Sequence, residues 1–260
     1  MSLLKKWCKK DHLIPGCSTL RVGSHIDYRW TSQKSISDIE EGGFTLKFEN
    51  KAPFYVSKED FCRLFPGYFF DGPSYFTWDS RGFGSSDGLS VIVQDGKVTV
   101  HAGGNHTWMF PNCFVFSMTY ESSSRASPFH EYDSEWSINS DHTDEMAEEL
   151  RVQVERCIRP FEVITSDCLN LVRGEKTLSV DVMHGPVLYG LREIKFSGDR
   201  DYDLHRFEDE YWKMPFVKPL GYEAEKEYRF VIAITWNGMP LSIYDRSILI
   251  PSEPFLKFLS

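Results

Sequence analysis

The sequence has no long uncharged apolar run and no excess of positive charge. No stretch approaches the roughly 20 apolar residues that a membrane-spanning helix needs, and residues 1–4 lead directly into lysines, unlike a secretory signal peptide. The net charge is −9, which argues against a general electrostatic grip on a nucleic-acid backbone. We therefore expect a cytoplasmic protein with no membrane partner.

The common motifs of catalysis and metal binding are also absent. The sequence contains no P-loop, no G-x-G-x-x-G, no G-x-S-x-G and no H-E-x-x-H. Its 6 cysteines include no C-x-x-C pair and no zinc-like spacing. The glycine-rich stretch 82–88 precedes a hairpin strand, so it lacks the helix N-terminus that would hold a phosphate. We expect reduced thiols and no metal site.

Hydrophobic and aromatic residues are plentiful by contrast. They make up 41% and 15% of the 260 residues, enough for a substantial core and far from the composition of a disordered chain. We find no repeat and no long linker, so we predict a single domain over 1–260. Residues 1–14 are expected to form an N-terminal helix with Leu3, Leu4 and Trp7 inward, and residues 31–110 an insertion between the first two core strands.

Periodicity and turn residues predict an α+β fold, because strands outnumber helices and the helices interrupt them irregularly. The clearest helix is 143–158, with Met146, Leu150 and Val154 in one stripe and acids in its first turn. Shorter helices are expected at 57–65 and 202–212. Expected strands are 19–30, 44–48, a hairpin of 89–93 with 97–100 around Asp-Gly, 113–119, a pair formed by 178–182 with 187–189, 228–235 and 247–250.

The most informative stretch is Lys218 to Ile232. Glu223, Glu225 and Glu227 alternate there and lead into a strand rich in β-branched and aromatic residues. Side chains alternate faces along a strand, so Glu225 and Glu227 should project from the same side. Like charges so placed repel each other and lower sheet propensity, which favours a use in chemistry. The alternative is a solvated strand edge, and this segment alone leaves the two interpretations balanced.

Three strand segments in order carry a resemblance to a known family: Arg21-Val22-Gly23-Ser24, then Phe116-Ser117-Met118-Thr119, then Glu225-Lys226-Glu227. This order resembles the R-S-E type of the ADP-ribosyltransferase superfamily, and the run from 225 to 253 is similar to the last strands of DarT-type toxins. The resemblance implies a mixed or antiparallel split sheet with flanking helices, and a cleft that binds NAD as substrate.

The same resemblance assigns roles. Glu227 would stabilise the positive charge that develops on the ribose, and Glu225 would orient or deprotonate the acceptor. Arg21 would pair with a phosphate, and Ser117 would bind the ribose or support Glu227. Ser24 also belongs to the expected NAD-binding residues.

Aromatic side chains are the remaining part of the expected NAD site. Tyr28, Trp30 or Tyr132 would stack on nicotinamide or adenine. An alternative keeps His25 in place of Arg21 as the first-strand residue of an H-Y-E arrangement, with Tyr120 or Tyr132 as its partner. The sequence leaves both possibilities open.

The leading hypothesis is thus a transferase that moves ADP-ribose from NAD to RNA, DNA or protein, as a bacterial or phage toxin or defence effector. An antitoxin or inhibitor protein would be a further partner. The alternative is a non-enzymatic acidic binding protein that inhibits a host or phage factor. A metal-dependent nuclease built from Asp79, Asp87, Asp181 and the glutamates ranks last, since these acids have no recognisable spacing.

Overall fold

The chain divides into two compact units, which are described one at a time. A computed structural model describes residues 2–30, 38, 41–48, 54–57, 68–70, 76–78, 85–87, 90–94, 97–101, 105–120, 132–190, 192–196, 206 and 209–260. Unit 1 comprises Met1–Glu41, Asn112–Gly190 and Phe216–Ser260, and unit 2 comprises Gly42–Pro111 and Leu191–Pro215. Where the sequence predicts one domain with an insertion over 31–110, most of that insertion forms unit 2 together with residues 191–215.

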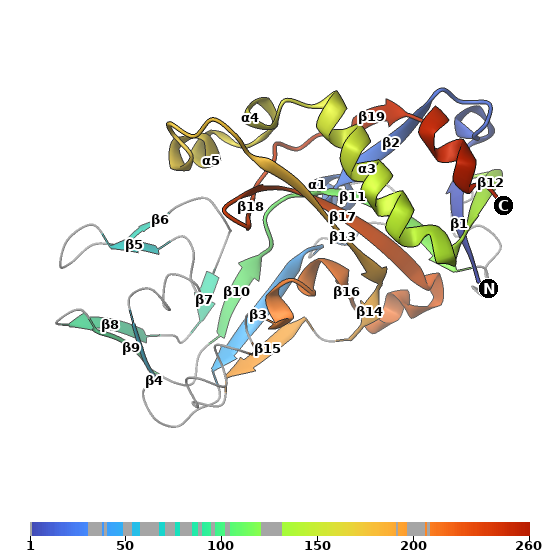
Figure 1. Cartoon of the computed structure of the whole chain (residues 1–260). Coiled ribbons are helices and arrows are strands. Elements are labelled where there is room, and N and C mark those ends of the chain that lie inside the picture. The colour runs from blue at the N-terminus through green and yellow to red at the C-terminus, as the bar shows by residue number, and fades with distance from the viewer. Residues whose placement is uncertain are drawn as a thin grey trace. The chain divides into compact units, whose positions relative to one another are not determined.

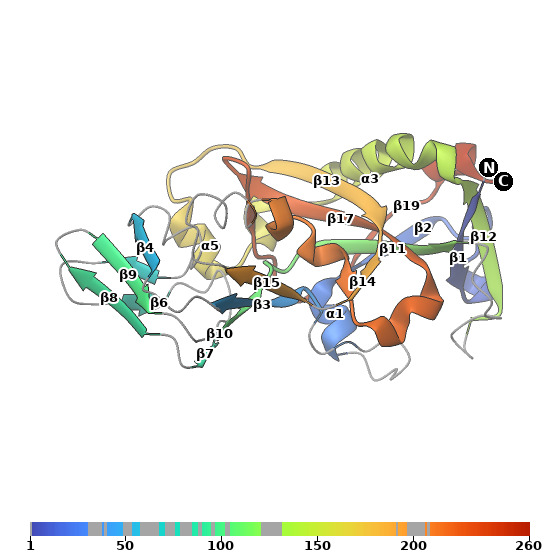
Figure 2. The ribbon, with the colours of Figure 1, turned by 90° about the horizontal axis from the view of Figure 1, so that it is seen from below.

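Unit 1 is built on a curled antiparallel sheet with helices (Figures 1 and 2). The α+β class expected from the sequence is therefore confirmed. The central strands lie in the order β12 (Ser134–Asn139), β1 (Leu3–Cys8), β11 (Phe114–Tyr120), β17 (Glu227–Trp236) and β13 (Ser179–Pro186). Three more strands join them: β2 (Thr19–Ser24) pairs with β11 and with β19 (Ile248–Pro251), and β18 (Met239–Leu241) pairs with β17.

The sheet splits along one edge of β11. At the start of β11, Phe114 and Val115 pair with β2, whereas at its end Thr119 and Tyr120 pair with β1. Between the two, the Lys6 ammonium donates a hydrogen bond to the backbone carbonyl of Ser117 at 2.7 Å. A side-chain donor thus bonds a backbone carbonyl at the split, between the residues that pair with β2 and those that pair with β1.

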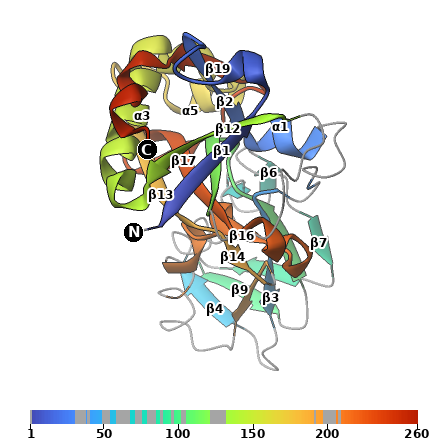
Figure 3. The same cartoon turned by 90° about the vertical axis from the view of Figure 1, so that its right-hand side faces the viewer.

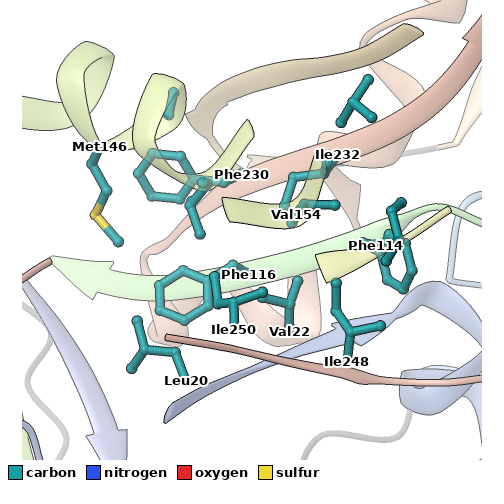
Figure 4. Packing of buried hydrophobic residues seen from close by; sticks show 14 of the residues in the cluster. Leu20, Val22, Phe114, Phe116, Met146, Val154, Phe230, Ile232, Ile248 and Ile250 are labelled. Atoms are coloured by element: carbon teal, nitrogen blue, oxygen red, sulfur yellow. The ribbon is translucent and has the colours of Figure 1, made fainter. Parts of the chain in front are cut away.

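One face of the sheet forms the core of unit 1. Helix α3 (Thr143–Cys157) covers it, and the predicted stripe of Met146, Leu150 and Val154 is fully buried there. The stripe packs over Phe116 and Phe230, with apolar side chains from β2 and β19 below (Figure 4). Two observations explain why α3 forms where predicted: a 3.6-residue apolar period, and Asp144 and Glu145 in the first turn, where the helix dipole favours acids.

The predicted N-terminal helix over 1–14 is wrong. Residues 3–8 form β1, which pairs with β12 through six residues and with the end of β11. Leu4 points into the core, while Lys5 points outward to an ion pair with Glu135 at 2.7 Å. Pairing with two strands more than 100 residues away outweighs the local helical pattern, which a single sequence cannot anticipate. The two described ends of unit 1 lie close to β12 (Figure 3).

The predicted strand 19–30 ends halfway, at Ser24, and helix α1 (His25–Trp30) follows. The Ser24 hydroxyl accepts from the Asp27 amide at 3.3 Å, and the Asp27 carboxylate accepts from the Ser24 amide at 2.9 Å. This reciprocal arrangement is a capping box, which starts a helix. The sequence therefore contains a helix-start pattern, Ser24-His25-Ile26-Asp27, which argues against a continuous strand.

The rest of unit 1 consists of short elements. Strand β14 (Leu188–Tyr189) pairs in parallel with β16 (Val217–Lys218), and β13 pairs with β17, so the predicted pairing of 178–182 with 187–189 is wrong. The remaining short helices are η1 (Lys10–His12), η2 (Ser140–His142), α4 (Pro160–Val163), α5 (Ser166–Leu171), η4 (Leu220–Glu225) and η5 (Glu253–Phe258). The helix η3 (Met214–Phe216) has its first two residues in unit 2 and its last in unit 1. In the part of the chain that the structure describes, no helix is both long and apolar enough to cross a membrane.

Unit 2 contains its own sheet, in the order β15 (Glu193–Phe196), β3 (Gly43–Phe48), β10 (Asn105–Met109) and β7 (Ser85–Asp87). Phe48 of β3 stacks on Phe196 of β15, with ring centroids 4.7 Å apart. The predicted hairpin is present as β8 (Ser90–Gln94) and β9 (Lys97–His101), next to β4 (Phe54–Ser57), and β5 (Tyr68–Phe70) pairs with β6 (Phe76–Trp78). Of the helix expected at 202–212, Arg206 and residues 209–211 are helical; the helix expected at 57–65 lies outside the described residues.

Candidate functional site

Charged side chains are buried on the face of β17 that points away from α3. Tyr228 and Phe230 belong to the core, and the alternation of the strand turns Glu227 and Arg229 to the opposite face. There Glu227 is 6% exposed and Arg229 only 1%. Buried charges require partners, because an isolated ion loses its hydration without compensation.

Glu227 is held by two cations. Its Oε1 accepts from Arg229 Nε at 2.7 Å, and its Oε2 lies 2.6 Å from Lys218 Nζ. The same ammonium donates to Glu225 Oε2 at 2.9 Å. Two carboxylates therefore converge on one lysine, and all three side chains are less than a tenth exposed.

Glu225 reaches this position from outside the strand. It is the last residue of η4, and Lys226 then adopts a left-handed conformation with φ of 45° before β17 begins at Glu227. The expectation that Glu225 and Glu227 project from one side of a single strand is therefore wrong in its geometry. The two carboxylates are nevertheless neighbours, because the turn at Lys226 brings both to Lys218.

A third carboxylate extends the cluster. Arg229 Nη1 donates a very short hydrogen bond to Glu41 Oε1, and His25 Nδ1 lies 3.7 Å from the same oxygen. The Glu41 backbone carbonyl accepts from Arg29 Nε at 2.6 Å, which fixes this segment against α1. His25 is fully buried, and burial lowers its pKa despite the nearby Glu41 carboxylate.

The surroundings of the three carboxyl groups shift their pKa values in different directions. Burial alone would raise the pKa of Glu227, but the attraction of Arg229 and Lys218 outweighs it and lowers that pKa to about 2. Glu41 follows the same pattern, with burial overcome by Arg229 and its pKa well below the usual value. For Glu225 burial prevails over Lys218, and the pKa is raised. Neighbouring carboxyls with opposite shifts are typical of acid–base sites, although structural ion networks produce them too.

Three half-buried polar residues border the carboxylates. The Tyr189 hydroxyl accepts from the Glu227 amide at 2.8 Å. Burial and the Glu227 charge raise the pKa of Tyr28 to about 12. The Tyr28 phenol is close enough to Ser117 for that hydroxyl to affect its pKa, but the geometry does not satisfy a hydrogen bond: Ser117 Oγ is buried without a partner among the described residues.

The structure thus gathers Glu225, Glu227, Ser117, Tyr28 and His25 in one cluster. Other predicted residues lie elsewhere. The Arg21 side chain is 64% exposed and pairs with Asp27 at 3.5 Å, and Ser24 serves the capping box of α1. Between Arg21 and His25, the two first-strand candidates, only His25 lies in the cluster.

The remaining aromatic candidates are not placed in the cluster. Tyr120 packs edge-to-face against Tyr228 on the core side, with centroids 5.9 Å apart. Tyr132 is half-buried just before β12. The side chain of Trp30 lies outside the described residues.

Of the aspartates in the nuclease hypothesis, the structure describes the side-chain contacts of Asp181 alone. Asp181 accepts a very short hydrogen bond from Thr235 Oγ1, Asp87 belongs to unit 2, and Asp79 is not described. Across the described ranges, no group of three or more His, Cys, Asp or Glu side chains is arranged to hold a metal ion.

Sequence reasoning missed Lys218, Arg229 and Glu41. The sequence could have indicated Arg229, because a charge in the middle of an apolar strand must be buried and paired. Its partner Glu41 lies 188 residues away in the sequence, and no local pattern reveals such a contact. Lys218 opens the informative stretch, but only the fold shows that it faces two glutamates.

A separate shallow cavity of about 220 Å³ lies on the α3 side of unit 1, lined by Asp144, Ala147, Glu148, Arg151, Val182 and His184. His184 bonds the Tyr228 hydroxyl through Nδ1 at 2.7 Å, and its Nε2 lies 3.2 Å from Asp144. These contacts engage both ring nitrogens of His184.

Comparison with known proteins adds no family. No protein-family model matches the chain, and neither the curated proteins nor the solved structures provide a match.

Proposed function

We propose that the protein is a cytoplasmic ADP-ribosyltransferase that uses NAD as substrate and modifies a macromolecule, as a toxin or defence effector. One observation carries the proposal: Glu225 and Glu227 converge on Lys218 while their pKa values shift in opposite directions. The split antiparallel sheet of unit 1 supports the ADP-ribosyltransferase-like fold that the sequence resemblance implies.

Glu227 is suited to stabilise positive charge. Breaking the bond between nicotinamide and ribose builds oxocarbenium character on the sugar, which a fixed carboxylate stabilises. The lowered pKa keeps Glu227 ionised at every physiological pH. Arg229 donates to both of its oxygens and Lys218 contacts one of them. A carboxylate offers about four lone-pair sites, so one remains for a ribose hydroxyl.

Glu225 is suited to proton transfer. A general base works best when its pKa lies near the operating pH, and burial moves the pKa of Glu225 in that direction. In the proposed reaction Glu225 takes a proton from the acceptor nucleophile as that atom bonds to the ribose carbon and nicotinamide leaves. The acceptor is RNA, DNA or protein, with a nitrogen nucleophile as the favoured chemistry.

In this proposal two half-buried residues, Tyr28 and Ser117, contact the bound NAD. Tyr28 offers an aromatic ring beside Glu227, and Ser117 offers a hydroxyl without a partner in the described chain. In this proposal His25, the first residue of α1, takes the place of the first-strand residue and supports the site through Glu41. A phosphate-binding role for Arg21 stays a prediction from the resemblance, as does stacking by Tyr132.

The test is NAD consumption and transfer of labelled ADP-ribose into cell lysate, comparing wild type with Glu227→Gln. The matched control is Glu253→Gln, an exposed glutamate of the same unit. We expect Glu227→Gln to lose about 10²-fold or more of the rate, and the control to keep it. Glu225→Gln should lose transfer while NAD cleavage by water persists. Absence of NAD turnover and NAD binding in the wild type would refute the proposal.

The alternative, an acidic binding protein that inhibits a host or phage factor, is favoured by one surface feature. Helix α3 exposes Asp144, Glu145, Glu148 and Glu155, which suits a basic partner. Such a protein needs no chemistry at Glu227. It would show no NAD turnover, and its inhibitory effect in cells would respond to Glu148→Lys but not to Glu227→Gln.

A further inference from the structure

Lys218 occupies a fixed position between two acids. The Lys218 backbone, in strand β16, pairs with Tyr189, and the Lys218 carbonyl accepts from the Gly190 amide at 2.9 Å. Its side chain is only 6% exposed, with Nζ 2.9 Å from Glu225 Oε2 and 2.6 Å from Glu227 Oε2. An ammonium has three donors, and two of them serve these carboxylates.

The charges around the two acids are unequal. Arg229 bonds Glu227 directly and is shared with Glu41, whereas Lys218 is the cation that contacts Glu225. Two carboxyls so close, without a cation between them, would repel and share one proton. The ionisable groups that face Lys218 are Glu225 and Tyr222 of η4, Glu227 and Arg229 of β17, Tyr189 of β14, Tyr28 of α1, and Glu41. Lys6 of β1 is a further cation that interacts with Glu227.

We propose that Lys218 is the positioning residue that holds Glu225 and Glu227 side by side and allows both to carry a negative charge. Its catalytic meaning rests on the proposed transferase function, but the effect on the two acids does not. Lys218 itself contacts neither acceptor nor sugar in this proposal. It acts through the acids, because its charge favours the ionised form of both, while Arg229 bonds Glu227 as a second cation.

The experiment is a pH titration of the glutamate side-chain carboxyl carbons by NMR in the full chain, with signals assigned through Glu225→Gln and Glu227→Gln. Lys218→Met removes the ammonium and keeps most of the apolar stem, and Lys218→Arg restores a cation. Lys257→Met, which removes an exposed lysine paired with Glu149 at 2.8 Å, is the matched control.

In Lys218→Met we expect the pKa of Glu225 to rise by about one unit or more, and that of Glu227 to rise with it. Lys218→Arg and Lys257→Met should leave both titrations close to wild type. Unchanged titrations in a folded Lys218→Met variant would overturn the inference. If Lys218→Met does not fold, Glu225→Gln provides the second arm: losing one of its two acids should lower the pKa of Lys218, read from its ε-carbon, and an unchanged Lys218 would overturn the inference equally.

The NAD assay separates this inference from the proposed function. Shifted titrations in a protein that never consumes NAD would leave the role of Lys218 standing and remove the transferase. Rapid NAD turnover with unchanged carboxyl titrations would support the transferase and overturn the role of Lys218. If both hold, the pH dependence of ADP-ribose transfer should move to higher pH in Lys218→Met, in step with Glu225.

Discussion

Arg229 bonds Glu227, its neighbour on the same face of β17, and Glu41, a residue 188 positions earlier in the chain. One guanidinium thus joins the central strand of unit 1 to the segment that follows α1. Because Arg229 is 1% exposed, water cannot take over either contact if the other partner is lost.

Replacing Arg229 should therefore be costly. Arg229→Met would leave Glu41 without its guanidinium and Glu227 with Lys218 alone, and removal of one partner from a buried ion pair typically costs about 3–5 kcal/mol. We expect a loss of that size in the free energy of unfolding, measured by urea denaturation. Arg21→Met, at an exposed ion pair with Asp27, should change it by less than about 1 kcal/mol. Equal effects for the two variants would contradict the buried network.

Acid should destabilise the protein through Glu227. The folded-state pKa of about 2 lies below the reference value of 4.5, so the contribution of Glu227 is fully present above pH 4.5. It is lost as the pH falls through about 2, because folding then requires releasing a proton that the unfolded chain binds more tightly.

The corresponding measurement is urea unfolding of wild type and Glu227→Gln between pH 6 and pH 2. Wild type should lose roughly 3 kcal/mol more than the variant over this range, so the two curves converge toward low pH. Glu225 acts in the opposite sense, since its raised pKa means that its ionisation costs stability as the pH rises. Parallel curves would show that Glu227 is not held as an anion.

Local patterns in the sequence predict elements better than they predict partners. The stripe of Met146, Leu150 and Val154 predicts α3, and the β-branched run predicts β17, because in both the period of one segment determines what it buries. The N-terminal segment has a helical stripe too, yet it forms β1 through contacts with two distant strands.

The same limit applies to the candidate site. The alternating acids identify Glu225 and Glu227, but the cations that set their charge states come from β16 and from the interior of β17. Arg21 and His25 are equally good first-strand candidates in the sequence. A capping box that ends β2 early turns His25 inward and leaves Arg21 at the surface.

Substitution of Ser117 should show whether its hydroxyl serves the fold or binds a ligand. Its Oγ is buried beside Tyr28 and has no hydrogen-bond partner in the described part of the chain. Ser117→Ala should therefore change the free energy of unfolding by no more than about 0.5 kcal/mol, because no bond is broken. If the hydroxyl binds NAD, the same variant should weaken NAD binding roughly 5- to 10-fold, the value of one hydrogen bond. Calorimetric titration with NAD and urea unfolding measure the two effects, and a large loss of stability with unchanged NAD affinity would assign the hydroxyl to the fold.

The backbone conformation of Lys226 determines how the Glu225 carboxylate is placed next to that of Glu227. Its φ of 45° places it in the left-handed region, which β-branched residues adopt only at a cost of about 1–2 kcal/mol. Lys226→Val should lower the free energy of unfolding by about that amount and draw the backbone toward an extended strand, where Glu225 no longer reaches Lys218. Lys226→Gly tolerates the left-handed turn and is the matched control, with its carboxyl titrations unchanged from wild type. Transfer of ADP-ribose should fall in the valine variant and persist in the glycine variant, whereas equal activity in both would mean that the contact of Glu225 with Lys218 is dispensable for the reaction.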